Sequence, residues 1–340
     1  MSNQHLESIA RALVQKGKGI LAADESSGTI KKRFESIRTE STEESRRSYR
    51  ELLFSTHGIE EFISGVILFD ETVRQTAISG DPFPRVLSGK GIIPGIKVDT
   101  GAKGLPGFPG EKVTEGLDGL RERLAGYREL GARFAKWRAV ITIGKGIPTR
   151  FCIDANAHAL ARYAALCQEA GLVPIVEPEV LMDGDHEIGR CEEVTEATLS
   201  TVFSHLLEHR VKLEGILLKP NMVLSGKSCP VQAGVQEVSE ATVRCFRRVV
   251  PAAVPGIVFL SGGQTPEQAT ENLNAMNAMG SHPWELSFSY GRALQEPALK
   301  AWQGKATNVV DAQQAFYHRA RCNGAARYGN YSRSMESAAA

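Results

Sequence analysis

Residues 214–221 read EGILLKPN, a short apolar run that passes from Gly215 to Leu218 directly into Lys219. Pro220 follows, and a proline there favours an extended backbone at Lys219 and ends the run just beyond it. The stretch is typical of a strand that is buried on both faces, as in a parallel sheet. A lysine at the end of such a strand loses much of its water, which costs several kcal/mol unless the amine is paired or neutral.

Similar runs recur along the chain, and eight strands are expected in all. They span residues 19–24 (GILAAD), 65–70 (GVILFD), 93–99 (IPGIKVD), 132–143 (ARFAKWRAVITI), 172–180 (LVPIVEPEV), 214–221, 256–263 (GIVFLSGG) and 286–293 (LSFSYGRA). Longer helical patterns separate most of these runs. Eight strands that alternate with helices in a chain of 340 residues favour an α/β fold, a single (β/α)8 TIM barrel, over a doubly wound sheet.

Polar residues and glycines mark the expected ends of three helices. The expected caps are Asp118 with Gly131, Asp154 with Gly171, and Thr265 with Gln268, the last a capping box with Pro266 at the first helical position. At the N-terminus, Leu6, Ile9 and Leu13 recur at helical spacing. They predict a short amphipathic helix and not an export signal.

The bulk composition is that of an ordinary soluble globular protein, with 42% hydrophobic and 23% charged residues. A formal net charge of +1 gives no reason to expect nucleic acid or an anionic membrane as a partner. No apolar run approaches the roughly 20 residues that a membrane helix needs. The six cysteines show no C-x-x-C spacing and are expected to be reduced thiols, which implies the cytoplasm.

Polar residues gather where the predicted strands end. They are Asp24, Lys97, Asp99, Lys136, Arg138, Glu177, Glu179, Lys219, Ser261, Gly262, Gly263, Ser289, Gly291 and Arg292. In a (β/α)8 barrel these ends form one face, which carries the active site. Because side chains alternate along a strand, Lys136 and Arg138 point the same way, as do Glu177 and Glu179. Each residue alone is typical of a solvated loop, whereas the whole set predicts one pocket.

The clustered lysines suggest a chemical role for Lys219. An ammonium group has no lone pair and cannot attack a carbonyl, but burial and a cationic neighbour such as Lys136 favour the free amine. A free amine forms a Schiff base with a ketone, and the Schiff base draws in electrons when the neighbouring carbon–carbon bond breaks. The nearby glutamates can carry the protons that these steps require.

Two segments with glycines predict a phosphate site. Gly262 and Gly263 follow one strand and precede the capped helix at Thr265, so their backbone N–H groups can cradle a phosphate. The segment YGRA, residues 290–293, repeats this arrangement after the next strand, and Arg292 can add a charge-assisted contact. The loops after the seventh and eighth strands are the usual phosphate site of a TIM barrel.

From about residue 5 to 330 the chain resembles class I fructose-bisphosphate aldolase, through the ordered motifs GILAADES, GIKVD, AKWR, VPIVEPE, LLKPNMV, FLSGGQ and FSYGRALQ. The resemblance implies a Schiff-base enzyme of glycolysis and gluconeogenesis. Such an enzyme reversibly cleaves fructose 1,6-bisphosphate to dihydroxyacetone phosphate and glyceraldehyde 3-phosphate. The resemblance also implies a homotetramer, a phosphorylated sugar as the substrate, and no metal or other cofactor.

Matched motif by motif, the resemblance implies a role for each residue of the predicted pocket. Lys219 would form the Schiff base, and Glu177 would donate and accept protons while it forms. Glu179 and Lys136 would support this network, and Asp24 would orient the substrate and help to deprotonate its C4 hydroxyl. The residues that match the C1-phosphate site are Ser261, Gly262, Gly291 and Arg292, with Ser289 as a further substrate-binding candidate. Lys97, Arg138 and Arg33 are expected toward the other phosphate.

The chain departs from the animal enzymes of this family in two places. Thr29 stands where they have a serine and keeps the hydroxyl. The animal enzymes end in a tyrosine that assists proton exchange, whereas this chain ends ESAAA. We expect a barrel over residues 1–321 and a mobile tail over residues 322–340, because this end is rich in Ser, Gly and Ala. Tyr328 and Tyr331 are the candidates in that tail for the missing tyrosine.

Three other functions were weighed against this one. A zinc-dependent class II aldolase would reach the same products, but His205 and His209 in SHLLEHR do not form an H-E-x-x-H motif and are typical of a helix surface. Another phosphosugar lyase or isomerase on a barrel would not require the lysine set. A binding role on the cytoskeleton or on another glycolytic enzyme is not specifically encoded, since the basic stretches 46–50 and 245–250 fit helix faces.

Overall fold

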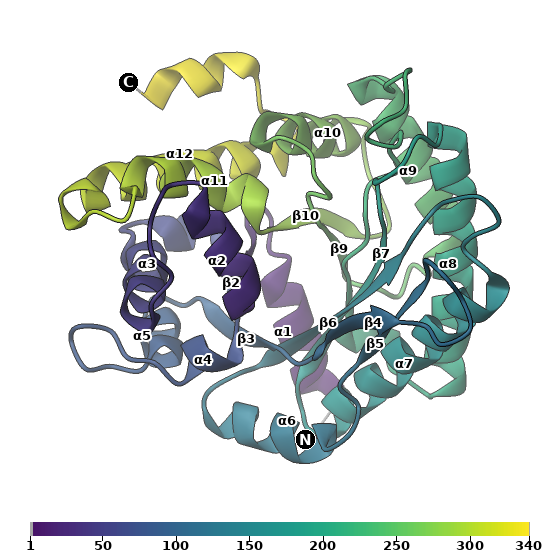
Figure 1. Ribbon diagram of the computed structural model, residues 1–340, viewed down its shortest axis with the longest axis horizontal. Coiled ribbons are helices and arrows are strands. Elements are labelled where there is room, and N and C mark those ends of the chain that lie inside the picture. The colour runs from purple at the N-terminus through teal and green to yellow at the C-terminus, as the bar shows by residue number, and fades with distance from the viewer. Residues whose placement is uncertain (1–2, 340) are drawn as a thin grey trace.

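Eight parallel strands form a closed barrel in the computed structural model, which describes residues 3–339, and the helices surround it (Figure 1). Around the barrel the strands follow the order β1-β10-β9-β8-β7-β6-β3-β2. Their bounds are β1 Gly19–Ala23, β2 Ile63–Leu68, β3 Ile93–Lys97, β6 Phe134–Ile141, β7 Val173–Val180, β8 Leu217–Leu218, β9 Gly256–Phe259 and β10 Glu285–Tyr290. Each predicted run overlaps one of these strands, so the predicted (β/α)8 barrel is confirmed.

The helices alternate with the strands along the chain. The α-helices are α1 Asn3–Leu13, α2 Ser27–Glu35, α3 Glu43–Ser55, α4 Asp70–Val73, α5 Phe83–Gly89, α6 Leu120–Glu129, α7 Arg150–Glu169, α8 Ile188–Glu208, α9 Val235–Val249, α10 Pro266–Ala278, α11 Arg292–Trp302 and α12 Val309–Ala326. Four short 3-10 helices are η1 Ile59–Glu61, η2 Leu213–Gly215, η3 Ala306–Asn308 and η4 Arg333–Ala339.

Successive residues of the strands belong to two separate apolar clusters. One cluster fills the inside of the barrel, and its strand residues are Ile20, Ala22, Ile67, Phe134, Val173, Ile175, Leu217 and Val258. Their neighbours in sequence, such as Leu21, Ala135 and Leu218, belong to the second cluster, between the strands and the surrounding helices. This period of two continues past the apolar residues. Lys219, two places after Leu217, is therefore directed into the barrel.

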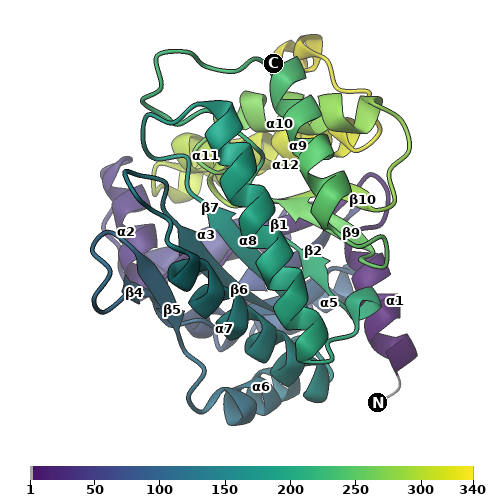
Figure 2. The same cartoon turned by 90° about the vertical axis from the view of Figure 1, so that its right-hand side faces the viewer.

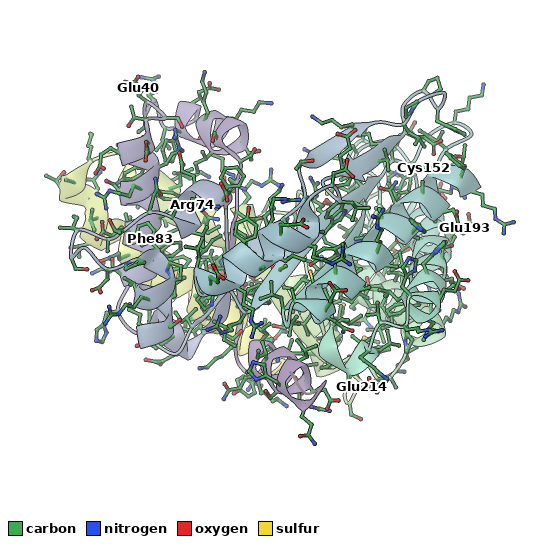
Figure 3. All side chains as sticks on the ribbon, turned by 90° about the horizontal axis from the view of Figure 1, so that it is seen from below. Glu40, Arg74, Phe83, Cys152, Glu193 and Glu214 are labelled. Carbon is green, nitrogen blue, oxygen red and sulfur yellow. The ribbon has the colours of Figure 1, made fainter. Side chains whose placement is uncertain are left out.

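The N-terminal helix α1 closes the end of the barrel where the strands begin. Its Leu6, Ile9 and Leu13 are buried in the inner cluster, which confirms the predicted apolar stripe. Glycines on the strands make room for this end of the chain, because a Cβ on Gly65 would lie 2.6 Å from the side chain of Leu13. Seen from below in Figure 3, α1 lies beside the labelled Glu214 of η2.

Two helices begin at other residues than the sequence patterns predict. Helix α7 starts four residues before Asp154, because the hydroxyl of Thr149 accepts a hydrogen bond from the Cys152 N–H at 3.1 Å and caps the helix there. Asp154 instead pairs with His205 on α8. Helix α6 begins after Gly119, which has a φ of 63°, so Asp118 does not occupy the cap position.

The other predicted caps are confirmed. At α10 the side chain of Thr265 accepts from the N–H of Gln268, and Gln268 in turn accepts from the N–H of Thr265. The helices α6 and α7 are each followed by a glycine with a positive φ, Gly131 and Gly171. Glycine adopts this left-handed conformation at little steric cost, which is why it is common after helix ends.

Two further parts of the chain differ from the sequence analysis. Strands β4 (Gly101–Gly104) and β5 (Lys112–Glu115) form an antiparallel hairpin beside the barrel, which the sequence analysis did not predict (Figure 2). The segment expected to begin a mobile tail at Cys322 instead continues α12 to Ala326. Cys322, Arg327 and Tyr331 are buried, so the packed part of the chain extends past residue 321.

The six cysteines are free and buried, in agreement with the prediction of reduced thiols. Over residues 3–339, no helix combines the length and the apolar character that crossing a membrane requires.

The glycines in the strands generate a stability prediction. A Cβ at Gly95 in β3 would overlap the ring of Phe134 inside the barrel, so Gly95→Ala is expected to cost about 1–3 kcal/mol of unfolding free energy. The matched control is Gly126→Ala in α6, where a Cβ would meet open space and replacement of a helical glycine is expected to stabilise the protein. Urea unfolding followed by circular dichroism measures both changes. Equal losses in the two variants would contradict the packing argument.

Candidate active site

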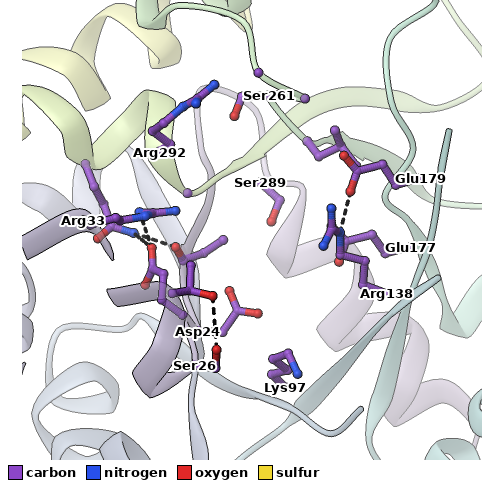
Figure 4. Close-up of a pocket in the computed structure, with 18 of the residues that line it drawn as sticks. Asp24, Ser26, Arg33, Lys97, Arg138, Glu177, Glu179, Ser261, Ser289 and Arg292 are labelled. Atoms are coloured by element: carbon purple, nitrogen blue, oxygen red, sulfur yellow. Dashed lines mark hydrogen bonds and ion pairs between the residues drawn. The ribbon is translucent and has the colours of Figure 1, made fainter. Parts of the chain in front are cut away.

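A cavity of about 660 Å³ opens at the carboxyl ends of the barrel strands (Figure 4). Every residue that the sequence analysis assigned to catalysis or to substrate binding lines it. These are Asp24, Arg33, Lys97, Lys136, Arg138, Glu177, Glu179, Lys219, Ser261, Gly262, Ser289, Gly291 and Arg292. These residues share one cavity because every second side chain of a strand faces the inside of the barrel, and this alternation continues to the carboxyl end of each strand.

Four buried charged side chains form a continuous chain across the floor of this cavity. Nζ of Lys136 lies 2.7 Å from Oδ2 of Asp24 and 3.2 Å from Oε2 of Glu177. Nζ of Lys219 lies 3.2 Å from Oε1 of the same Glu177. Lys136 and Glu177 lie within β6 and β7, whereas Asp24 and Lys219 directly follow β1 and β8, and the four side chains are between 4% and 12% exposed. Their signs alternate, which supplies each buried charge with the opposite charge it needs.

The electrostatics fix the charge of two members of this chain. Burial would raise the pKa of Asp24, but the ammonium groups of Lys136 and Lys219 outweigh it and hold the pKa of Asp24 well below its usual range. Burial also disfavours a charged Lys136, yet Asp24 and Glu177 on either side raise the pKa of Lys136 above that of a free lysine. At neutral pH, Asp24 is therefore a carboxylate and Lys136 a cation.

Further ion pairs orient the basic residues at the side of the cavity. Arg138 donates from Nε to Oε2 of Glu179 at 2.5 Å, a pair drawn with a dashed line in Figure 4. Lys97 donates from Nζ to the carboxylate of Asp99 at 2.6 Å and to its backbone carbonyl at 2.8 Å. Arg138 keeps a half-exposed side chain, with 43% of its area open to solvent. The guanidinium group of Arg138 can therefore contact a ligand that enters from solvent while its ion pair with Glu179 fixes its orientation.

The opposite end of the cavity is built from backbone and from Arg292. Gly262 and Gly263 line the cavity with φ values of 54° and 88°, a left-handed backbone of the kind found in backbone turns that bind anions. A guanidinium nitrogen of Arg292 lies 3.7 Å from the point where a Cβ on Gly263 would stand. The hydroxyl of Ser289 is buried without a hydrogen-bond partner among the described residues, so it is available to a ligand.

Arg33 lies elsewhere in the cavity than expected. The sequence analysis assigned it to the end with Lys97 and Arg138. One of its guanidinium nitrogens instead lies 3.6 Å from the position that a Cβ on Gly291 would take, next to the start of α11. Figure 4 likewise shows Arg33 far from the labelled Lys97.

The sequence analysis missed Glu25, which organises one wall of the cavity. Its carboxylate accepts from Arg50 at 2.6 Å and from Gln295 at 2.9 Å, and it also pairs with Arg33. Burial raises the pKa of Glu25, but Arg33 and Arg50 outweigh it and lower the pKa below its usual value. Arg50 is 2% exposed, although its stretch 46–50 was interpreted as a helix face. The motif AADES, which places Glu25 directly after Asp24, was the one available signal.

The tyrosines near the C-terminus lie outside the cavity lining. The phenol of Tyr331 donates to Oε1 of Glu336 at 2.6 Å, and its backbone N–H donates to Asn274 on α10. Tyr328 is half exposed and lies near Lys16, whose ammonium is 5.7 Å from the ring centre. Neither tyrosine therefore takes the place of a terminal tyrosine at the cavity in this arrangement.

The fold and the cavity together define a class of protein. An eight-stranded barrel with a buried lysine amine, paired acids and anion-binding groups at its carboxyl end is an enzyme of phosphorylated carbonyl compounds. The family model of class-I fructose-bisphosphate aldolase matches residues 5–340. This protein therefore belongs to the class-I fructose-bisphosphate aldolase family.

Curated relatives and a solved structure agree with this assignment. The chain is 60% identical over 332 residues to a protein of Xanthomonas campestris described as a probable fructose-bisphosphate aldolase class 1, covering 97% of this chain and 99% of that relative. It is 58% identical over 324 residues to fructose-bisphosphate aldolase 1 of Toxoplasma gondii, covering 95% and 89%. Fructose-bisphosphate aldolase from Plasmodium falciparum, solved in complex with TRAP and a small-molecule inhibitor, superposes with a TM-score of 0.96 at 54% identity, covering 97% and 95%.

Membership in this family defines the reaction. Class-I aldolases of glycolysis cleave fructose 1,6-bisphosphate reversibly through a lysine Schiff base, and they do so without a metal ion. The histidines weighed as part of a zinc centre lie away from the cavity. His205 is on α8 outside the barrel, His209 directly follows the end of that helix, and His205 pairs with Asp154 of α7.

The wall around Glu25 generates a prediction of stability and pH dependence. Glu25→Gln leaves the buried Arg50 without its counter-charge and is expected to cost about 3–5 kcal/mol of unfolding free energy. The folded-state pKa of Glu25 lies below the unfolded value, so its contribution is present above the unfolded pKa and is lost as the pH falls through the folded pKa. Urea unfolding between pH 7 and pH 3 measures both effects.

The control variant is Glu44→Gln, which removes an exposed carboxylate that pairs with Arg47 within one helix. Because exposed pairs contribute little, no measurable loss is expected there. A Glu25→Gln variant with the stability and the acid sensitivity of the parent protein would refute the argument.

Proposed function

We propose that Lys219 is the residue that forms the Schiff base with the substrate ketone. The single observation that carries this proposal is the position of its amine, which is buried in the barrel 3.2 Å from Oε1 of Glu177. In the first step the free amine of Lys219 attacks the C2 carbonyl of the open-chain sugar. Glu177 takes up the proton that the Lys219 ammonium loses before this attack, and a nitrogen proton of the adduct moves to its C2 alkoxide. Glu177 then returns its proton to the resulting C2 hydroxyl, which leaves as water as the iminium forms.

Asp24 takes the role of base in the cleavage step of this proposal. Its carboxylate accepts the proton of the C4 hydroxyl, the C3–C4 bond breaks, and its electron pair moves toward the iminium nitrogen. Glyceraldehyde 3-phosphate leaves first, and protonation and hydrolysis of the remaining enamine release dihydroxyacetone phosphate. The lowered pKa of Asp24 means that the group is ionised, and so free to accept a proton, before the substrate arrives. Lys136, held as a cation between Asp24 and Glu177, keeps the two carboxylates in place.

The two ends of the cavity fit a sugar with two phosphates. Ser261, Gly262, Gly291 and Arg292 are proposed to bind the C1 phosphate, and Arg33 joins them because it lies beside Gly291. Lys97 and Arg138 are proposed to bind the phosphate at the other end. Figure 4 supports this division, since Ser261 and Arg292 lie together and away from Lys97. Ser289, with its unpartnered hydroxyl, is proposed to contact the sugar between them.

The cellular setting follows from the resemblance and from the cysteines. We propose that the protein acts in the cytoplasm, as the six free and buried thiols support. The resemblance to class I aldolases supports a homotetramer. Sedimentation equilibrium tests the assembly, and a mass of about one chain at micromolar concentration would contradict it.

The Schiff-base proposal predicts a covalent adduct at one lysine. Borohydride in the presence of dihydroxyacetone phosphate is expected to inactivate the enzyme and to add mass at Lys219, located by peptide mass spectrometry. Lys219→Ala is expected to abolish both the adduct and cleavage, whereas Lys227→Ala, which changes an exposed lysine of the following loop, keeps both. Cleavage is expected to persist in excess EDTA. Mass found on Lys136 or Lys97 would assign the reaction to another amine.

The phosphate proposal predicts a change in KM. Arg292→Ala removes a charged hydrogen-bond donor, a loss of roughly 1.5–3 kcal/mol, and 1.4 kcal/mol corresponds to a factor of ten. KM for fructose 1,6-bisphosphate is therefore expected to rise about tenfold or more in steady-state kinetics. Lys300→Ala is the control, because Lys300 is an exposed cation on the same helix α11. An unchanged KM in Arg292→Ala would place the C1 phosphate elsewhere.

A further inference from the structure

Three potential metal ligands meet where the C-terminal segment packs on α12, far along the chain from the catalytic residues. His318 and Cys322 lie one turn apart on α12, and Glu336 comes from η4. Figure 1 shows the C-terminal segment in yellow beside α12. One ligand atom from each of the three residues lies within 4.8 Å of the others. The reaction derived above uses none of them.

We propose that His318, Cys322 and Glu336 bind a zinc ion. A thiolate, an imidazole and a carboxylate are the ligands that zinc takes in proteins. Zinc–sulfur bonds of about 2.3 Å and zinc–nitrogen bonds of about 2.0–2.1 Å, at a tetrahedral angle, place the two ligand atoms about 3.5 Å apart. Sγ of Cys322 lies 3.6 Å from Nε2 of His318, and Oε2 of Glu336 lies 3.7 Å from the same nitrogen. Small side-chain movements suffice to close the site.

Neighbouring groups orient the carboxylate of this site. Oε1 of Glu336 accepts from the hydroxyl of Tyr331 at 2.6 Å, and Oε2 accepts from Arg319 at 2.8 Å. Such outer partners fix ligand orientation in metal sites. The positive charge of Arg319 opposes the ion, so binding is weaker than in a site with four protein ligands. The proton of Cys322 leaves to solvent on binding, because the thiolate is the form that ligates.

An open path leads to the site. A cavity of about 1080 Å³ is lined by both His318 and Glu336, and carboxylates of Glu61, Glu267 and Asp311 line it as well. Arg319 and Arg321 line the same cavity, so with Glu336 its carboxylates outnumber its guanidinium groups by four to two, and the cavity leaves room for water as the fourth ligand. Cys322 is fully buried and does not line this cavity. The ion would therefore join α12 to η4 and hold the C-terminal segment against the barrel.

The chain offers a second place where zinc could bind, and the test must separate the two. The rings of His158, His205 and His209 lie together on α7 and α8, with centroids 5.1–6.3 Å apart. Asp154 lies 2.9 Å from His205, but among the described residues no three ligand atoms of this group lie within 4.8 Å of one another. Binding there is the alternative outcome.

The test measures zinc binding to the full chain after chelator treatment and dialysis, by competition with a chromophoric zinc indicator. One zinc per chain is expected in the parent protein. Cys322→Ser is expected to abolish binding, and Glu336→Gln, which also removes a counter-charge of the buried Arg319, is expected to weaken it about tenfold or more. The controls are Cys245→Ser, which changes a buried cysteine on α9, and His209→Ala. Both are expected to retain zinc binding. With cobalt instead of zinc, a thiolate charge-transfer band is expected, and Cys322→Ser removes it.

Trypsin provides an independent readout. Arg333 is exposed and begins η4, so zinc is expected to slow cleavage after Arg333 in the parent protein and not in Glu336→Gln. Absence of zinc binding by the parent protein overturns the proposal. So does binding that survives Cys322→Ser and is lost in His209→Ala, because that result assigns the ion to the histidines of α7 and α8.

Discussion

The pairing of buried charges across the floor of the barrel is the constraint on which the rest of the site depends. Asp24, Lys136, Glu177 and Lys219 alternate in sign, so two acids and two amines share a space from which water is largely removed. A charge in such a place costs several kcal/mol when its partner is missing. In the proposed mechanism Lys219 gives up its proton, and the acids beside it provide the place where that proton goes. Lys136 keeps one positive charge between the carboxylates throughout.

The features that follow from a strict period of two could be predicted from sequence. Lys219 stands two residues after Leu217, and Lys136 stands two residues after Phe134, so each polar residue inherits the inward direction of an apolar one. Because parallel strands in a barrel end at one face, the polar ends converge there whatever the details of the helices. For this reason the residues that line the cavity could be predicted from the sequence, although β8 is only two residues long. The roles of the individual residues remain proposals that rest on family resemblance.

The features that depend on pairing across long sequence separations could not be predicted in this way. The ion pair of Glu25 with Arg50 joins the end of β1 to α3, and no local pattern distinguishes the buried Arg50 from its exposed neighbours in the stretch 46–50. The β4–β5 hairpin has short strands of mixed composition, which give no clear alternation. The composition of residues 322–340 suggested mobility, whereas burial of Cys322 and Tyr331 depends on surfaces of α10 and α12 that composition does not reveal.

The position of α1 has a consequence for the order of events during synthesis. Leu6 and Leu13 leave the ribosome before any strand of the barrel, yet their inner cluster includes Leu217 and Val258. At about 5–20 residues per second, the apolar face of α1 waits on the order of 10–50 s for its complete set of partners. During that time the apolar face of α1 is exposed, because only a nearly complete barrel can bury it. A helix that is made before every strand of the barrel is therefore among the last elements to be packed, and a chaperone that shields the nascent chain at this stage would act on α1.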